Sequence, residues 1–373
     1  MKNIFTIMLS TIAITSAYAN TNPEIAIIDA GSSGTRLHVY QENNNKLESV
    51  YESSNKDPIS GFIYNTNQAA KPIEDLLNTA SASVTNIHSI PIYVYATAGM
   101  RYVPTMQQNE IYQNVTSTLK TDGYNVIQAK TISGEDEGLF DWISVNYLND
   151  DLGTQKTSGA LDLGGASTQI AFTVDTPSVA NKNFTYNGIR YNIYSKSFLG
   201  LGLDKATSGI SSTLKAKQYC FPESYWSTEL TDGVESAYNN IECKQSANKY
   251  VRKNFNGIYN ISNVLRNSTA ESYVAFSGFY YTSSFFGING ESNISDINTK
   301  TNAICDVTWN DFVGNFGFNK YSANECLNSN YLQSLLTNYG FAKTLPINFE
   351  DSINGQSVDW SIGAALYILN NDA

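Results

Sequence analysis

Two short segments of this chain share one pattern, and this repeat limits the possible folds more than any other feature. Each segment is an apolar run that ends in an aspartate, followed by a turn of very small residues and a threonine. The aspartates are Asp29 and Asp162, 133 positions apart. Tiny residues let backbone N–H groups wrap around an anion, because no Cβ stands in the way. The repeat therefore predicts a duplicated β-hairpin unit whose two loops face one phosphate chain across a cleft. The segments are IIDAGSSGTR (27–36) and ALDLGGASTQ (160–169).

Hydrophobic spacing divides the rest of the 373 residues into strands and helices. Apolar residues at helical spacing predict a helix over 138–148, and small and apolar residues predict a buried closing helix over 358–366. Segments 175–195 and 285–330 are rich in Asn, Ser, Thr, Gly and Tyr, and we expect loops and short strands of an elaborated second lobe there. The expected strands are 24–29, 35–40, 91–95, 159–163 and 168–174, with a helix after the third.

The N-terminus has the features of a secretory signal. Lys2 is followed by an apolar stretch and by small residues at a cleavage site before Asn20. The stretch is too short for a spanning helix, so we expect residues 1–19 to be removed and the protein to be exported, periplasmic or secreted, without a membrane anchor. An uncleaved anchor is the alternative. Loss of Lys2 lowers the net charge from −11 to −12, which excludes nonspecific binding of nucleic acid or anionic lipid.

The chain has four cysteines, all in its second half. None forms a C-x-x-C pair, so a zinc site is disfavoured. An even number of cysteines in an exported chain favours two disulfides. Of the three possible connectivities the simplest joins neighbours, Cys220 with Cys243 and Cys305 with Cys326, and the sequence leaves this choice open.

The turns and their aspartates carry groups that suit a phosphate and a cation. A carboxylate directly after an apolar strand faces a cleft, and two from opposing lobes could hold a hydrated Mg²⁺ or Ca²⁺ through water. The alternative is that each aspartate caps its own turn. Backbone N–H groups, hydroxyls and a fork-shaped cation in the first turn suit a terminal phosphate, whereas the alternative is a tight hairpin with an ordinary surface arginine. These phosphate candidates are Ser32, Ser33, Gly34, Thr35 and Arg36.

An acidic stretch, GEDEG (134–138), precedes a predicted helix. Acids stabilise a helix N-terminus, and this structural role is one interpretation. The chemical hypothesis is that one glutamate accepts the proton of a water that attacks phosphorus. Ser167, Thr168 and Gln169 could orient that water, although a polar start of a strand is also possible.

Other catalytic patterns are absent from the sequence. The Walker and dinucleotide-binding glycine patterns do not occur in the two turns. His38 and His88 are the only histidines, and no H-E-x-x-H sequence is found. A covalent route is therefore unsupported, and direct attack by water is the simplest mechanism.

Six motifs resemble conserved regions of the nucleoside triphosphate diphosphohydrolases, or apyrases. The first four are similar to the first four apyrase-conserved regions, the fifth to the fifth region, and the last to the closing helix of the family. They occur in the family's order and cover nearly the whole mature chain. Unlike vertebrate surface members, this chain has no membrane helices and few cysteines, so it resembles the soluble, exported, bacterial-style form. The motifs are DAGSSGTR (29–36), ATAGMR (96–101), GEDEG (134–138), DLGGASTQ (162–169), FSGFYY (276–281) and VDWSIGA (358–364).

The resemblance implies a fold and a reaction. The fold would be α/β, actin-like (ribonuclease H-like) and two-lobed, with a duplicated β-hairpin phosphate-binding unit and a central cleft. Lobe I would hold residues 20–140 and about 355–373, and lobe II about 141–354. The reaction would be stepwise hydrolysis of terminal phosphate from nucleoside tri- and diphosphates with Mg²⁺ or Ca²⁺ as cofactor. We expect a monomer.

The resemblance also implies roles for single residues. Glu137 would be the base, and Ser167 and Gln169 would hold the attacking water. Asp29 and Asp162 would bind the water shell of the metal. The residues implied to contact phosphate are Ser32, Ser33, Thr35, Arg36, Thr97, Gly165 and Ala166, and the candidates to stack on the nucleobase are Tyr281 and Tyr280.

Three alternatives stay open at this point. A related actin-like phosphatase that acts on polyphosphate or guanosine polyphosphates would use the same loops but would need no base-stacking aromatic residues. A kinase of this superfold would need a pocket for an acceptor. A slow nucleotide-binding switch would depend on an ATP supply found inside cells, which the expected export argues against.

Overall fold

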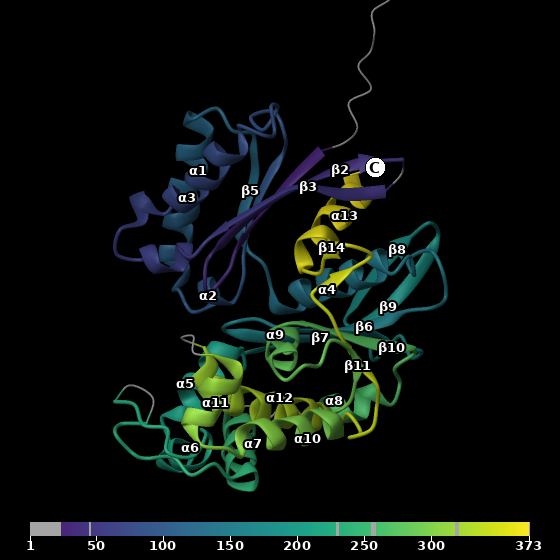
Figure 1. Cartoon of the computed structure of the whole chain (residues 1–373). Helices are drawn as coiled ribbons and strands as arrows, with labels where there is room; N and C mark the ends of the chain where they lie inside the picture. The colour runs from purple at the N-terminus through teal and green to yellow at the C-terminus, as the bar shows by residue number, and fades with distance from the viewer. Residues whose placement is uncertain (1–23, 45, 229–230, 255–258, 318–320, 373) are drawn as a thin grey trace, which may run out of the picture.

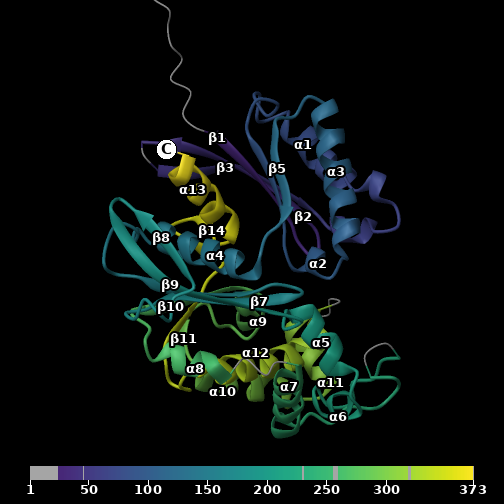
Figure 2. The same cartoon turned by 180° about the vertical axis from the view of Figure 1, so that it is seen from behind.

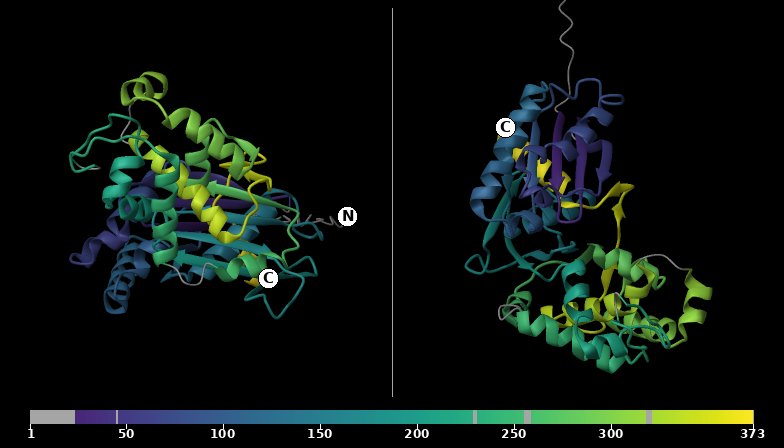
Figure 3. Two further views of the ribbon diagram at one scale, coloured as in Figure 1. Left: turned by 90° about the horizontal axis from the view of Figure 1, so that it is seen from below. Right: turned by 90° about the vertical axis from the view of Figure 1, so that its left-hand side faces the viewer.

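The computed structural model describes residues 24–44, 46–228, 231–254, 259–317 and 321–372. The expected signal peptide, 1–19, lies outside the described residues. The chain is mixed α/β, with two large β-sheets in two lobes stacked one above the other (Figures 1 and 3). A small two-stranded sheet of β13 (Ser352–Ile353) and β14 (Gln356–Ser357) precedes the last helix.

The first hairpin motif forms the centre of a five-stranded sheet. In spatial order this sheet consists of β3 (Lys46–Asn55), β2 (Thr35–Asn43), β1 (Glu24–Ala30), β4 (Ile92–Ala96) and β5 (Val126–Thr131). The strand β1 pairs antiparallel with β2 and parallel with β4. Outside this centre, β3 is antiparallel to β2, and β5 is parallel to β4.

The second hairpin motif lies in a seven-stranded sheet that contains the same five-strand pattern. In spatial order this sheet consists of β11 (Gly290–Ser292), β12 (Ile347–Phe349), β10 (Ser272–Ser277), β6 (Ser158–Leu163), β7 (Ser167–Thr173), β9 (Ile189–Leu199) and β8 (Lys182–Tyr186). The strand β6 pairs with β7 and β10 as β1 pairs with β2 and β4. The cross-strand pairs correspond as well, because Asp29 lies opposite Arg36 and Asp162 opposite Gln169. The duplication expected from the two turns is thus present in both topology and register.

Strand alternation explains why both aspartates face the space between the sheets. Successive side chains in a strand point to opposite faces. In β1, Ile25 and Ile27 belong to the core between the two sheets, and Asp29 continues that face. In β6, Ala160 belongs to the same core, and Asp162 follows it on the same face.

Two helices fill the space between the sheets, α4 (Gly134–Leu148) and α13 (Trp360–Asp372) (Figures 1 and 2). The two helices nearly touch at Gly363, where a Cβ would lie 2.0 Å from the carbonyl oxygen of Phe140. The N–H of Gly363 donates a hydrogen bond of 2.9 Å to Oγ of Ser144. The small-residue helix expected near the C-terminus is therefore confirmed. The core around α13 includes residues of both sheets, so this helix packs against both lobes. The lobe bounds given above stay a prediction.

The remaining helices cover the outer faces of the two sheets. The outer face of the first sheet packs against α1 and α3, and the second sheet packs against the helices of the lower lobe (Figure 1). None of the helices in the described ranges has the length and apolar character that a membrane span requires. The outer helices are η1 (Ile59–Phe62), η2 (Thr66–Gln68), α1 (Lys71–Ala80), α2 (Ala98–Arg101), α3 (Thr105–Thr121), α5 (Leu203–Ser211), α6 (Leu214–Tyr219), α7 (Asn240–Asn254), α8 (Tyr259–Leu265), α9 (Gly278–Phe285), α10 (Ile294–Cys305), α11 (Trp309–Phe316), η3 (Ser322–Asn324) and α12 (Glu325–Tyr339).

The prediction of loops and short strands for 285–330 is wrong, because α10, α11 and the first turns of α12 lie there. The α12 helix buries polar side chains along much of its length, which hides the helical period in the sequence. These side chains find partners nearby: Asn330 Nδ2 donates to the carbonyl oxygen of Cys326 at 2.8 Å, and the hydroxyls of Thr301 and Ser329 lie 2.5 Å apart. For 175–195 the expected short strands are present as β8 and much of β9.

The two disulfides have the neighbour pairing, Cys220–Cys243 and Cys305–Cys326. Both lie in the lower lobe. The first joins the end of α6 to α7, and the second joins the end of α10 to α12. They fasten helices outside the duplicated five-strand units.

We expect the Gly363→Ala substitution to destabilise the fold by about 1–3 kcal/mol, because overpacking forces the two central helices apart. Gly61→Ala is the matched control, since a Cβ at Gly61 would meet nothing within 4 Å. Denaturant unfolding of both variants measures the difference. Equal free energies of unfolding for the two variants would contradict close packing at Gly363.

Candidate active site

A cleft of about 360 Å³ lies between the two lobes, where the two hairpin turns face each other. A Cβ on Gly165 of the second turn would lie 3.0 Å from Oγ of Ser32 in the first turn, so the turns approach closely. The second turn is held from below by the start of α5, since the N–H of Leu203 donates to the carbonyl oxygen of Gly164 at 2.8 Å. The cleft is therefore built from the two parts that the repeat predicted.

Carboxylates are the main charged groups in the wall of this cleft. Among the described residues that line it, Arg36 is the only lysine or arginine. Its Nη1 donates to Oδ2 of Asp29 at 2.8 Å, and its side chain is 43% exposed. A cleft with this charge repels a phosphate chain unless positive charge enters with it. The lining acids are Asp29, Glu52, Glu137, Asp162, Asp204, Asp351 and Asp359.

Asp29 and Asp162 have the properties of ligands for a hard cation. Oδ1 of each is buried and has no hydrogen-bond partner among the described residues. Burial raises the pKa of Asp29, although the Arg36 charge opposes this effect, and burial together with the Glu137 charge raises the pKa of Asp162 to about 7. Carboxylate oxygens are the ligands that Mg²⁺ and Ca²⁺ prefer. In the described ranges no three His, Cys, Asp or Glu side chains converge on one metal position, so other ligands would have to come from water or phosphate.

The first turn of α4 brings Glu137 to the cleft. Ser133 caps the helix: its Oγ accepts from the N–H of Asp136 at 3.0 Å. The helix approaches β9 closely, since a Cβ on Gly138 would lie 2.4 Å from Oγ of Ser195 and one on Gly134 2.3 Å from Cβ of Ser197. The two glycines of the GEDEG motif thus allow the helix to approach the second sheet. The three acids lie in the first turn rather than before the helix.

Glu137 is held by residues from both lobes. Nη2 of Arg101 donates to its Oε2 at 2.5 Å, and Nε2 of Gln169 donates to the same oxygen at 2.8 Å. The Gln169 amide also contacts the hydroxyls of Ser167 at 2.9 Å and Ser197 at 3.2 Å. Burial raises the pKa of Glu137, and the charge of Arg101 opposes the rise. A carboxylate with a raised pKa is suited to accept a proton near neutral pH.

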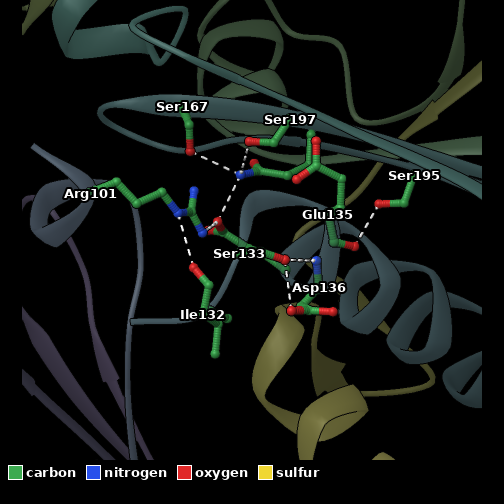
Figure 4. Close-up of polar contacts among 10 residues, drawn as sticks. Arg101, Ile132, Ser133, Glu135, Asp136, Ser167, Ser195 and Ser197 are labelled. Carbon is green, nitrogen blue, oxygen red and sulfur yellow. Dashed lines mark hydrogen bonds and ion pairs between the residues drawn. The ribbon is translucent and has the colours of Figure 1, made fainter. Parts of the chain in front are cut away.

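The other two acids of the motif make ion pairs away from this network. Glu135 pairs with Lys196 at 3.0 Å, and Asp136 pairs with Lys182 at 2.5 Å. Figure 4 shows Ser133 bonded to Asp136, and the backbone carbonyl of Glu135 bonded to Ser195. Glu135 and Asp136 therefore form structural ion pairs, whereas Glu137 lines the cleft.

Nine of the fifteen expected site residues line the cleft, and the other six do not. Ser167 and Gln169 are buried; Gln169 donates to Glu137, and Ser167 contacts the Gln169 amide. Thr35 is buried, and its hydroxyl donates to the carbonyl oxygen of Asp57 at 2.8 Å. The expected residues that line the cleft are Asp29, Ser32, Ser33, Arg36, Thr97, Glu137, Asp162, Gly165 and Tyr281, and those that do not are Gly34, Thr35, Ala166, Ser167, Gln169 and Tyr280.

Several site residues had no assigned role in the sequence. Ser197 lies on β9, far from any motif, and only the pairing of β7 with β9 places it beside Gln169. Ser277 has a positive φ of 55°, and its hydroxyl bonds to Asp162. It is the last residue of β10, as Ala96 is the last residue of β4. Arg101 belongs to the motif ATAGMR (96–101), but nothing in the sequence assigns it as the partner of Glu137.

The chain belongs to the GDA1/CD39 (nucleoside phosphatase) family, whose model matches residues 18–373. It is 28% identical to ectonucleoside triphosphate diphosphohydrolase 3 of Mus musculus, over 92% of this chain and 78% of that protein. It is also 28% identical to a guanosine-diphosphatase of Schizosaccharomyces pombe, over 95% of this chain and 75% of that protein.

Solved structures support the fold. The chain resembles a nucleoside triphosphate hydrolase from Neospora caninum with a TM-score of 0.68 at 14% identity, covering 94% of this chain and 93% of the other. A Ppx/GppA family member from Aquifex aeolicus has a TM-score of 0.59 at 13% identity, covering 94% and 98%. The expected actin-like two-lobed fold is thus confirmed. The family membership identifies the protein as an enzyme, a hydrolase of nucleotide phosphates.

We expect the Arg101→Gln substitution to move the acid limb of the pH–rate profile for phosphate release to higher pH. Arg101 lowers the pKa of Glu137 by its charge and hydrogen bond, so without it the carboxylate form is lost at a higher pH. Arg190→Gln, at an exposed position on β9, is the control. An acid limb that stays in place in the Arg101 variant would show that the pair does not set the ionisation of Glu137.

Proposed function

We propose that this enzyme hydrolyses the terminal phosphate of nucleoside tri- and diphosphates by direct attack of a water that Glu137 activates. The observation that carries the proposal is the position of Glu137, which lines the same cleft as both small-residue turns while Arg101 and Gln169 hold one of its oxygens. The water oxygen forms a bond to the terminal phosphorus, and the bond from phosphorus to the bridging oxygen breaks. The water proton passes to Glu137.

Gln169 and Ser167 would orient the attacking water. Oε1 of Gln169 is buried and has no partner among the described residues, whereas its Nε2 is fixed by its bonds to Glu137 and Ser167. That oxygen can accept a hydrogen bond from a water beside Glu137. Gln169 and Ser167 do not line the cleft themselves, and they would orient the water from the buried layer beside Glu137.

The terminal phosphate would lie between the turns. Ser32, Ser33, Thr97 and Gly165 line the cleft there and offer hydroxyl and backbone donors. Arg36 adds a guanidinium that is already paired with Asp29, so its positive charge is partly compensated. The acidic lining thus favours a substrate that arrives as a complex with a cation.

Asp29 and Asp162 would hold the water shell of a divalent cation, Mg²⁺ or Ca²⁺, through their unpartnered oxygens. When bound, such a cation neutralises charge on the phosphate chain and on the leaving oxygen. The nucleobase would stack on Tyr281, which lines the cleft and is 66% exposed, rather than on Tyr280. This base contact favours a nucleotide over a bare polyphosphate.

We also propose that the enzyme acts as an exported monomer. The two disulfides support an oxidising compartment, since such bonds persist outside the cytosol.

Removal of divalent cations with EDTA should abolish phosphate release from ATP and ADP. The seven lining carboxylates repel an uncompensated phosphate chain. Addition of Mg²⁺ or Ca²⁺ in excess of the chelator should restore the rate. Orthophosphate release measures the effect, and full activity in EDTA would contradict the cation requirement. Tripolyphosphate serves as the comparison substrate, because hydrolysis at the rate of ATP would favour the polyphosphatase alternative.

The Glu137→Gln substitution should lower kcat for ATP hydrolysis about 10²–10⁴-fold, as expected for the loss of a general base. Nucleotide affinity should stay nearly unchanged, since the amide has a similar shape. The matched control is Glu135→Gln, two positions away in the same helical turn and paired with Lys196 instead. Equal rates for the two variants would exclude Glu137 as the base.

A further inference from the structure

A separate cavity of about 380 Å³, called the lysine cavity below, lies in the lower lobe among α7, α10 and α12, which pack together there (Figure 1). Among the described residues, none lines both this cavity and the cleft between the lobes. Asn240 of α7 donates through Nδ2 to Oδ1 of Asn298 of α10 at 3.0 Å, and the second disulfide joins α10 to α12. The N–H of Ser295 donates to the carbonyl oxygen of Lys343 at 3.0 Å. The walls of the lysine cavity are therefore tied to one another.

The lysine cavity contains positive charge without a counter-ion. Lys244 of α7 and Lys343, after α12, are the only charged residues among the described residues that line it. Lys244 is partly buried, and its Nζ donates to Oδ1 of Asn298 rather than to a carboxylate. Burial and the charge of Lys343 lower the pKa of Lys244 to about 8. Because two like charges near each other repel, an anion between them would be stabilised.

Hydrogen bonds behind the cavity wall fix the orientation of the Gln333 amide. The hydroxyl of Thr301 donates to the carbonyl oxygen of Ile297 at 2.7 Å. The 2.5 Å contact between the hydroxyls of Thr301 and Ser329 therefore uses the hydrogen of Ser329. Neither hydroxyl has a hydrogen left, so both can only accept from Gln333. Nε2 of Gln333 accordingly lies toward them, at 3.2 and 3.3 Å.

The other end of this amide is an acceptor without a partner. Gln333 lines the lysine cavity and is 2% exposed, and its Oε1 is buried without a hydrogen-bond partner among the described residues. Ser334 and Thr337, which also line the cavity, donate their hydroxyl hydrogens to carbonyl oxygens of α12 at 2.8 and 2.7 Å. Toward a ligand these hydroxyls present lone pairs. A buried acceptor is costly unless a ligand brings a hydrogen to it.

We propose that the lysine cavity is an anion site that binds orthophosphate. The two lysines match the negative oxygens of this ion, and Oε1 of Gln333 matches its P–OH group. Near neutral pH orthophosphate carries both features, whereas sulfate has a similar shape and charge but no proton to donate. The inference does not depend on the proposed function, since it follows from the cavity alone. Orthophosphate bound here would lie outside the cleft and would not compete directly with a nucleotide for it.

Titration calorimetry near neutral pH, in EDTA and in a buffer free of phosphate and sulfate, tests this inference. Without a cation the acidic cleft repels anions, so binding there is suppressed. The unsubstituted protein should bind orthophosphate, and sulfate should bind about 10-fold more weakly because it leaves Oε1 of Gln333 unpaired. Lys244→Gln, whose amide can still donate to Asn298, should weaken orthophosphate binding about 10-fold or more, because a hydrogen bond to a charged group is lost.

The matched control is Lys249→Gln, at an exposed position of the same helix that does not line the lysine cavity. It should leave the affinity unchanged. Absence of orthophosphate binding in EDTA, equal affinities for orthophosphate and sulfate, or equal affinities of the Lys244 and Lys249 variants would each overturn the inference.

A variant of the acceptor itself supplies a further test. Gln333→Met should bring the affinities for orthophosphate and sulfate together, because the carbonyl oxygen that distinguishes them is gone. The substitution also removes the bonds to Thr301 and Ser329, so its thermal unfolding is compared with that of the unsubstituted protein. The comparison of the two anions in the unsubstituted protein stands without this variant. A folded Gln333 variant that still prefers orthophosphate would contradict the assigned role of Oε1.

Discussion

The close packing of α4 against α13, between the two sheets, determines where the rest of the site can lie. The two helices approach until the backbone of Gly363 meets that of Phe140, which leaves no room for a side chain between them. With α4 fixed in this position, its N-terminal turn brings Glu137 to the lining of the cleft. Strand alternation then directs Asp29 and Asp162 into the same central layer. The site thus depends on a helix pair that belongs to neither sheet alone.

Charge within the central layer creates the main energetic problem of the site. Burial raises the pKa values of Asp29, Glu137 and Asp162, so their ionised forms are disfavoured when no cation is present. The two arginines nearby are already committed, Arg36 to Asp29 and Arg101 to Glu137. These ion pairs orient the carboxylates but leave little net positive charge for a phosphate chain. A divalent cation that enters with the nucleotide would resolve both difficulties, because it stabilises the carboxylates and neutralises the substrate.

The sequence predicts the parts of this structure that depend on local pattern. The two hairpins, their aspartates and the helix that carries Glu137 follow from apolar runs, small-residue turns and helical spacing. The Arg101–Glu137–Gln169 network does not, because it requires that three segments from two lobes meet. Ser197 reaches Gln169 only through the pairing of β7 with β9. The segment 285–330 was predicted wrongly for a different reason: Ser329 and Asn330 of α12 are polar yet buried, so composition indicated a surface loop where packing builds a helix.

The groups that we propose for the reaction lie in a different part of the molecule from a second, larger cavity. Groups assigned to the reaction come mainly from the duplicated strands and their turns, whose geometry is fixed by symmetric hydrogen-bonded pairing. The larger cavity, of about 920 Å³, which shares Tyr281 with the cleft, is formed instead by helices outside the duplicated five-strand units. Those helices need their own anchor, and the Cys305–Cys326 disulfide supplies one directly beside Glu325. Cys326 follows Glu325 in the first turn of α12, so the disulfide tethers the start of this helix to the end of α10. Substitutions in these helices therefore need not alter the registered strands that hold the proposed catalytic groups.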